Sequence, residues 1–282
     1  MPKDTLESFC YEGFYESSEL HRAKLASFLS NHFLSLKEIH LWNCYSVCGF
    51  SVTQLLHFAP ALESLVIENG IPGILYNVGL ELQHLSNVSW ASSRFRKLQL
   101  VVDIGHLSYL PPNNFHQAFS LPRLHQDVAA TSFGGLMANI GKQKDLRVLD
   151  LKVALPRHFF HRDGRPWVYQ DESFPGMLTL NRRAGNDPEN QDGRLRRGFL
   201  DMLAGLSKLE ELRGSVSLNS RDDQGYSTGR EEAEWMKMHW PRLKIAEFYP
   251  AVGGHVANDP DDEFLWLQKA LPGLIYSDDH SA

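Results

Sequence analysis

The chain has 282 residues, of which 43% are hydrophobic, so it can bury a substantial core. Its 28 basic and 34 acidic residues give a formal charge of -6, which argues against a surface built for the nucleic-acid backbone. Three cysteines are too few for a disulfide scaffold, and the sequence shows neither a secretory leader nor an apolar stretch of about eighteen residues. We therefore expect a cytoplasmic protein without membrane contact, with the nucleus as the alternative location.

The N-terminal part of the chain alternates strand and helix patterns. Residues 6–14 form a degenerate strand unit, and 17–34 predicts a helix because its apolar residues recur at helical spacing. Residues 36–44 (LKEIHLWNC) then fit the pattern L-x-x-I-x-L-x-x-C, and 62–70 (LESLVIENG) repeat its spacing. The run 52–58 between these two units predicts a helix that ends before Pro60.

The repeat becomes less regular in the middle of the chain. Residues 75–85 predict a helix and 95–103 another strand unit, whereas 104–130 has a poor pattern with a weak further unit at Leu121. Residues 134–142 predict a helix that leads into a clear strand unit at 146–154 (LRVLDLKVA). A loop-rich insert is expected at about 156–194, because its second half is polar and rich in turn formers.

Regular units return in the C-terminal part. Residues 195–206 predict a helix and 209–216 a strand unit, followed by a helix that begins at the capping box 228–231 and ends at Pro241. A strand unit at 243–248, a helix from Pro260 and a last strand near 274–276 complete the pattern.

A short strand, a turn, a helix and the same strand again are typical of a leucine-rich repeat. The sequence therefore predicts an α/β leucine-rich-repeat solenoid, a horseshoe with a parallel β-sheet on its concave face and helices on its convex face. No unit can bury its apolar side alone, so we expect residues 1–282 to form a single irregular domain. The eight units begin at Leu6, Leu36, Leu62, Phe95, Leu146, Leu209, Leu243 and Leu274.

Several segments resemble the repeat region of F-box/leucine-rich-repeat proteins. They are LKEIHLWNC, APALESLVIENG, GFLDMLAGLSKLEELRGSV, EEAEWMKMHWPRLKIAEFY and the final ALPGL. The resemblance implies a substrate receptor of a cullin-RING ubiquitin ligase, in which an F-box binds the ligase adaptor and the repeats bind the substrate. The F-box pattern itself is not found in the chain, so adaptor binding is expected only if an F-box lies upstream. The alternative is a stand-alone leucine-rich-repeat scaffold or regulator unrelated to ubiquitination.

Patterns that suggest chemistry have simpler interpretations. Residues 161–163 (HRD) match the letters of a kinase catalytic loop, but Val168 stands where that loop carries Asn. His158 beside this motif is weak evidence for metal, and Cys44 and Cys48 lack a second ligand pair. We therefore expect a protein that is not an enzyme and that has no catalytic residues, no cofactor and no metal.

Two further patterns concern loops. Gly134–Gly135 and Gly253–Gly254 lack the spacing of phosphate-binding loops and are interpreted as turns. The arginines between 182 and 197 predict a solvated basic stretch, and an acidic partner is the sharper hypothesis for them.

The outward strand positions supply the candidate binding surface. Trp, Tyr and Arg carry binding energy in protein interfaces most often, so Trp42, Arg213 and Tyr249 are expected to contribute most to binding a protein partner. The alternative is that many of these positions are simply solvated sheet residues. The predicted binding residues on the concave face are Glu38, His40, Trp42, Val66, Glu68, Lys97, Gln99, Asp150, Lys152, Glu211, Arg213, Glu247 and Tyr249.

Overall fold

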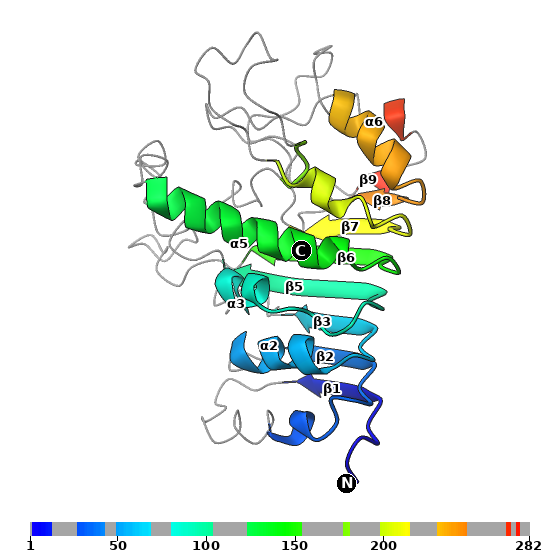
Figure 1. The fold of residues 1–282 in the computed structure, drawn as a ribbon. Helices are drawn as coiled ribbons and strands as arrows, with labels where there is room; N and C mark the ends of the chain where they lie inside the picture. The colour runs from blue at the N-terminus through cyan, green and yellow to red at the C-terminus, as the bar shows by residue number, and fades with distance from the viewer. Residues whose placement is uncertain are drawn as a thin grey trace, which may run out of the picture.

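An open parallel β-sheet runs through the chain and carries its helices on one side (Figure 1). The computed structural model describes residues 2–12, 27–42, 49–68, 80–103, 123–153, 177–180, 198–214, 230–246, 269–271 and 275–276. The expected α/β class with a parallel sheet is confirmed. The main strands are β1 (Ser8–Glu12), β2 (Glu38–Trp42), β3 (Ser64–Glu68), β5 (Lys97–Asp103), β6 (Val148–Val153), β7 (Glu211–Gly214), β8 (Ile245–Ala246) and β9 (Ile275–Tyr276).

The order of these strands in the sheet is their order in the chain. Each of the eight predicted units contributes one strand, and every pairing is parallel. The pairing matches equivalent repeat positions, for example Ile39 with Leu65 and Leu65 with Leu98. A ninth strand, β4 (Leu80–Glu81), pairs with the end of β5 and was not expected from the sequence.

The helices form a second layer in front of the sheet in Figure 1. They are α2 (Gly49–Phe58), α3 (Leu82–Asn87), α5 (Arg123–Gly141), the 3-10 helix η3 (Leu200–Leu203) and α6 (Arg230–His239). Neighbouring helices are in contact, α2 with α3, α3 with α5, and α5 with η3. Asn139 on α5 donates to the carbonyl oxygen of Val88 at 2.9 Å, which ties α5 to the end of α3. None of the helices in the described ranges has the length and apolar character that crossing a membrane requires.

Three helix predictions differ from the structure. Helix α5 already begins at Arg123 and includes Gly134 and Gly135, so interpreting this glycine pair as a turn is wrong. A side chain at Gly135 would approach the Cβ of Ser86 on α3 to 2.9 Å, so the glycine lets two helices come close. In the described part of the helix predicted at 195–206, residues 198–206 form only the 3-10 turn η3. In the described part of the helix predicted over 75–85, Leu80–Glu81 is strand β4 and the helix begins at Leu82.

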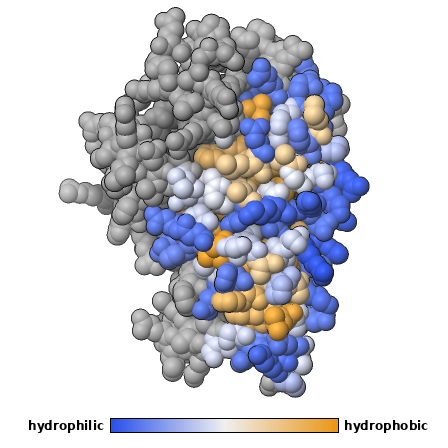
Figure 2. Space-filling model, in the orientation of Figure 1, coloured by the Kyte–Doolittle hydropathy of each residue, from blue (hydrophilic) through white to orange (hydrophobic). Residues whose placement is uncertain are grey.

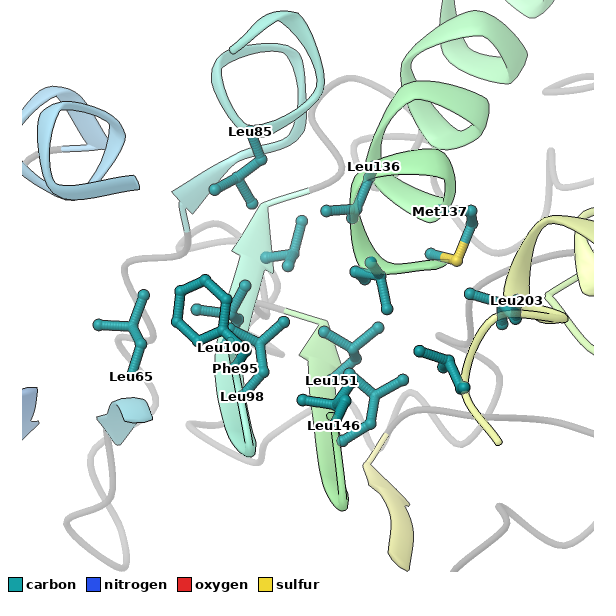
Figure 3. Packing of buried hydrophobic residues seen from close by; sticks show 14 of the residues in the cluster. Leu65, Leu85, Phe95, Leu98, Leu100, Leu136, Met137, Leu146, Leu151 and Leu203 are labelled. Carbon is teal, nitrogen blue, oxygen red and sulfur yellow. The ribbon is translucent and has the colours of Figure 1, made fainter. Parts of the chain in front are cut away.

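The core lies between the sheet and the helix layer. Figure 3 shows Leu85 of α3 and Leu136 and Met137 of α5 turned toward the side chains of β5 and β6, among them Leu98 and Leu151. The first position of the repeat is buried in each unit from the second to the seventh. Burying one such leucine stabilises the fold by about 1.5–3 kcal/mol, and each unit gains this only from its neighbours. The buried first-position residues are Leu36, Leu62, Phe95, Leu146, Leu209 and Leu243.

A charged ladder marks the edge where the strands begin. At this edge the N–H of each unit donates to the carbonyl of the unit before it, for example Lys37 to Glu7 at 2.7 Å and Glu63 to Lys37 at 2.7 Å. Side-chain ion pairs follow the same line, with Lys37–Glu7 at 2.9 Å, Arg96–Glu63 at 3.4 Å and Lys244–Glu210 at 2.9 Å. Figure 2 shows hydrophilic residues along this edge, on the right. Such exposed pairs contribute little energy individually, but opposite charges on successive units favour the observed register.

Part of the predicted insert is packed into the fold. Met177 and Leu178 are buried, and the N–H of Leu200 donates to the carbonyl of Thr179 at 3.1 Å. The carboxylate of the buried Glu232 on α6 accepts the N–H of Leu180 at 3.3 Å. Residues 177–180 therefore connect η3 to α6, while the rest of the predicted insert, up to 194, lies outside the described residues.

Candidate protein-binding face

Alternation along the strands separates a core face from an opposite face. Leu98, Leu100 and Leu151 turn toward α3 and α5 in Figure 3. Because successive strand residues point to opposite faces, Gln99 and Asp150 lie on the side of the sheet that faces away from the described helices. We call this side of the sheet the outer face.

The pairing register arranges the outer face in three rows. Eleven of the thirteen expected positions can be compared with these rows, and Glu247 and Tyr249 lie outside the described residues. The first row contains Ser8, Glu38, Ser64, Lys97, Val148, Glu211 and Ile245. The middle row contains Cys10, His40, Val66, Gln99, Asp150 and Arg213. The third row contains Glu12, Trp42 and Glu68 on β1–β3, with Val101 and Lys152 on β5 and β6.

A polar network crosses three strands of the outer face. The Nε2 atom of His40 lies 3.3 Å from Oε2 of Glu68, and the side-chain amide of Gln99 donates to Oε1 of Glu68 at 2.9 Å. Glu68 on β3 is therefore held from β2 on one side and from β5 on the other. Two contacts to one carboxylate restrict its rotamers and fix its position on the face.

Trp42 is the exposed aromatic residue of the outer face on β2. Its side chain is 44% exposed, and its ring centroid lies 4.8 Å from that of His40. A large rigid ring that stays accessible can supply contact area to a partner at low entropic cost. The ring of His40, which also contacts Glu68, positions this indole beside the polar network.

Ion pairs within single strands organise the other half of the outer face. On β6, Nζ of Lys152 lies 3.7 Å from Oδ2 of Asp150, and on β7, Nε of Arg213 lies 3.0 Å from Oε2 of Glu211. Residues two positions apart on one strand share a face, which explains both contacts. The charges of β6 and β7 are therefore largely balanced inside each strand.

Three residues of the middle row are almost completely buried. Val66, Gln99 and Asp150 are only 4%, 8% and 5% exposed, although they point away from the helices. A partner would therefore reach Trp42, Glu38 and Lys97 first, and the buried residues would act mainly by positioning their neighbours.

The outer-face residues of β1 are absent from the sequence-based set. Cys10 and Glu12 on β1 align with His40 and Trp42 on β2 and are both exposed. The spacing of Leu6, Phe9 and Tyr11 already indicates a repeat unit, so its outward positions could have been read in the same way. Glu12 places a second carboxylate beside Trp42.

The remaining sequence-based expectations concern metal binding and catalysis. Within the described residues, three or more His, Cys, Asp or Glu side chains nowhere gather in a way that would hold a metal ion. The motif at 161–163, His158 and the cysteines Cys44 and Cys48 lie outside the described residues. The expectation of a protein without catalytic activity therefore stays a prediction.

Comparisons with known proteins assign neither a family nor a function to the chain. No protein-family model matches the chain, and no curated protein matches its sequence. The resemblance of its repeats to F-box/leucine-rich-repeat proteins stays a prediction, and the outer face is the feature on which a functional hypothesis can be built.

Proposed function

We propose that the chain is a non-catalytic protein-recognition module that binds its partner with the outer face of the sheet. The observation that carries this proposal is the alignment of polar, charged and aromatic side chains in rows on the face of the sheet that points away from the described helices. Trp42, Arg213 and the charged residues between them combine the residue types that contribute most to protein interfaces. A rigid sheet holds them at fixed spacing, which lowers the entropic cost of binding.

The finer architecture in this proposal is a leucine-rich-repeat horseshoe in which the outer face is concave. The parallel strand order, one strand per unit, and the single helix layer support it. In this architecture Glu38, Glu211 and the other outer-face residues line the inside of the curve, where they can surround a convex partner.

The partner in the leading hypothesis is the substrate of a cullin-RING ubiquitin ligase, for which the chain would be the substrate-binding repeat region. The resemblance of the repeats to F-box/leucine-rich-repeat receptors supports this hypothesis. The alternative is a stand-alone repeat scaffold or regulator that is unrelated to ubiquitination. Co-purification of a ligase adaptor with the full protein, and slower turnover of the captured partner when the protein is depleted, would decide for the receptor.

The proposal is tested by affinity capture and mass spectrometry with variants of the outer face. Trp42→Ala and Arg213→Glu are expected to abolish capture of the specific partner without changing the unfolding curve, because both side chains are at least partly exposed. Met238→Ala is the matched control, since this residue of α6 is 74% exposed on the helix side and should not affect capture. Equal capture by both outer-face variants and the control would refute binding through the sheet.

A further inference from the structure

The outer face is divided into two halves of different charge. On β1–β3 its ionisable carboxylates are Glu12, Glu38 and Glu68, and no Lys or Arg occurs among the described outer-face residues of these strands. On β6 and β7 acidic and basic residues pair within each strand, as Asp150–Lys152 and Glu211–Arg213 do. The N-terminal half therefore has an excess of negative charge that the other half lacks.

Trp42 lies at the C-terminal end of β2, the middle strand of this acidic half. The pairing register places Glu12 on β1 directly beside it on one side and Glu68 on β3 on the other. Neighbouring strands are about 4.8 Å apart, so both carboxylates stand within reach of one group seated on the indole. An accessible aromatic ring between two carboxylates has the chemistry that attracts a cation, since the ring face and both side chains are negative.

The carboxylate of Glu68 is held in position before any partner arrives. Gln99 donates to one of its oxygens at 2.9 Å and His40 lies 3.3 Å from the other. His40 also contacts the ring of Trp42, with 4.8 Å between the ring centroids. The ring and the carboxylate are thus parts of one network, and less side-chain entropy is lost when they bind together.

We propose that the outer face of β1–β3 binds a basic segment of a protein partner, with an arginine or lysine side chain seated on Trp42 between Glu12 and Glu68. This inference rests on the proposed recognition function and specifies the chemistry of its partner. Arginine fits best, because a planar guanidinium stacks on the indole and can still donate hydrogen bonds to carboxylates on both sides. An acidic segment would be repelled by Glu12 and Glu68 at the same place.

The test is a selection of short random peptides, displayed on phage, against the immobilised full chain. Peptides with arginine or lysine are expected to be enriched, and their affinity is then measured by fluorescence anisotropy. Trp42→Ala should weaken their binding about threefold to thirtyfold, the range of a cation–π contact between exposed and desolvated settings. The double variant Glu12→Gln/Glu68→Gln should weaken it as well, and the loss should shrink at high salt because exposed charges are screened.

Two controls separate charge recognition from general effects. Replacing the enriched arginine by citrulline keeps its shape without the charge and should lower affinity at least about fivefold, as loss of the cation requires. Glu234→Gln is the matched control variant, because it removes an exposed carboxylate of α6, away from the outer face, and should leave peptide affinity unchanged. An unchanged unfolding midpoint verifies that each variant is folded.

The possible failures of the two proposals are distinguishable. Enrichment of acidic or apolar peptides whose binding depends on Arg213 and not on Trp42 would overturn the basic-segment inference while leaving recognition by the sheet intact. The same holds if arginine peptides bind the Trp42→Ala chain as tightly as the unchanged chain. If no peptide is enriched, or if no outer-face variant alters binding, both proposals fail.

Discussion

Two adjacent glycines in helix α5 should respond in opposite ways to the same substitution. Gly134 and Gly135 both lie in the helix interior, so Ala at either position gains about 0.5–1 kcal/mol of helix stability. At Gly134 the added Cβ would meet Met202 and Phe199 only at 3.7 Å, which is an ordinary contact. At Gly135 it would lie 2.9 Å from the Cβ of Ser86 and 3.0 Å from its carbonyl oxygen.

The contacts that a Cβ at Gly135 would make with Ser86 are too short unless α3 moves relative to α5. Overpacking of this kind typically costs roughly 1–3 kcal/mol. We therefore expect Gly134→Ala to stabilise the chain by about 0.5–1 kcal/mol, and Gly135→Ala to destabilise it by up to about 2 kcal/mol after its helix gain is subtracted.

Urea unfolding measures this difference, provided that the slope of the free energy with denaturant stays the same. Adding Ser86→Gly to Gly135→Ala removes one of the two short contacts, so the double-mutant cycle should give a coupling of at least about 0.5 kcal/mol. If Gly134→Ala and Gly135→Ala have equal unfolding free energies, the close approach of α3 and α5 is not as described.

Three further variants or conditions test the fold. Gly214→Ala on β7 should cost roughly 1–3 kcal/mol in urea unfolding from backbone strain alone, because φ is +98° there. Trp240→Phe should cost about 1–3 kcal/mol in the same assay, since it removes the hydrogen bond from the buried indole N–H to the Leu203 carbonyl at 3.2 Å and leaves part of the space of a fully buried ring unfilled. Hydrogen bonds from Lys208 and Lys244 lower the pKa of Asp145 below 3.8 and that of Glu210 below 4.5. Above these pH values both carboxylates are ionised and stabilise the fold fully, and this stabilisation is lost as the pH falls through the lower folded pKa values. The Asp145→Asn/Glu210→Gln variant lacks both ionisable groups, so its melting temperature should fall less steeply as the pH is lowered into the acid range.

The strands and their alignment were predictable because the relevant signals are local. Positions one, four and six of a unit are apolar, and alternation then assigns every residue between them to the opposite face. The two regular units at Leu36 and Leu62 set a register that the less regular units at Phe95 and Leu146 also follow. Even β1, whose unit is degenerate, pairs in that register with β2.

The helices were predicted less well, because their limits depend on contacts between units. Propensity disfavours two successive glycines in a helix, yet α5 continues through them, and a Cβ at Gly135 would lie only 2.9 Å from Ser86 of α3. The segment before β7 carries helical apolar spacing at Phe199, Leu203 and Leu206 but forms only one 3-10 turn. Neither outcome can be read from residues adjacent in sequence.

The sequence by itself determined which residues point toward the core and which toward the outer face, since strand alternation and repeat spacing are properties of the local chain. Only the tertiary structure decided how much of each outer-face side chain remains accessible, because accessibility depends on everything that packs around a side chain: Val66, Gln99 and Asp150 are buried, whereas Trp42 is 44% exposed. It also decided which groups meet. His40 and Gln99 reach the same carboxylate of Glu68 from two different strands, a contact between units that parallel pairing creates.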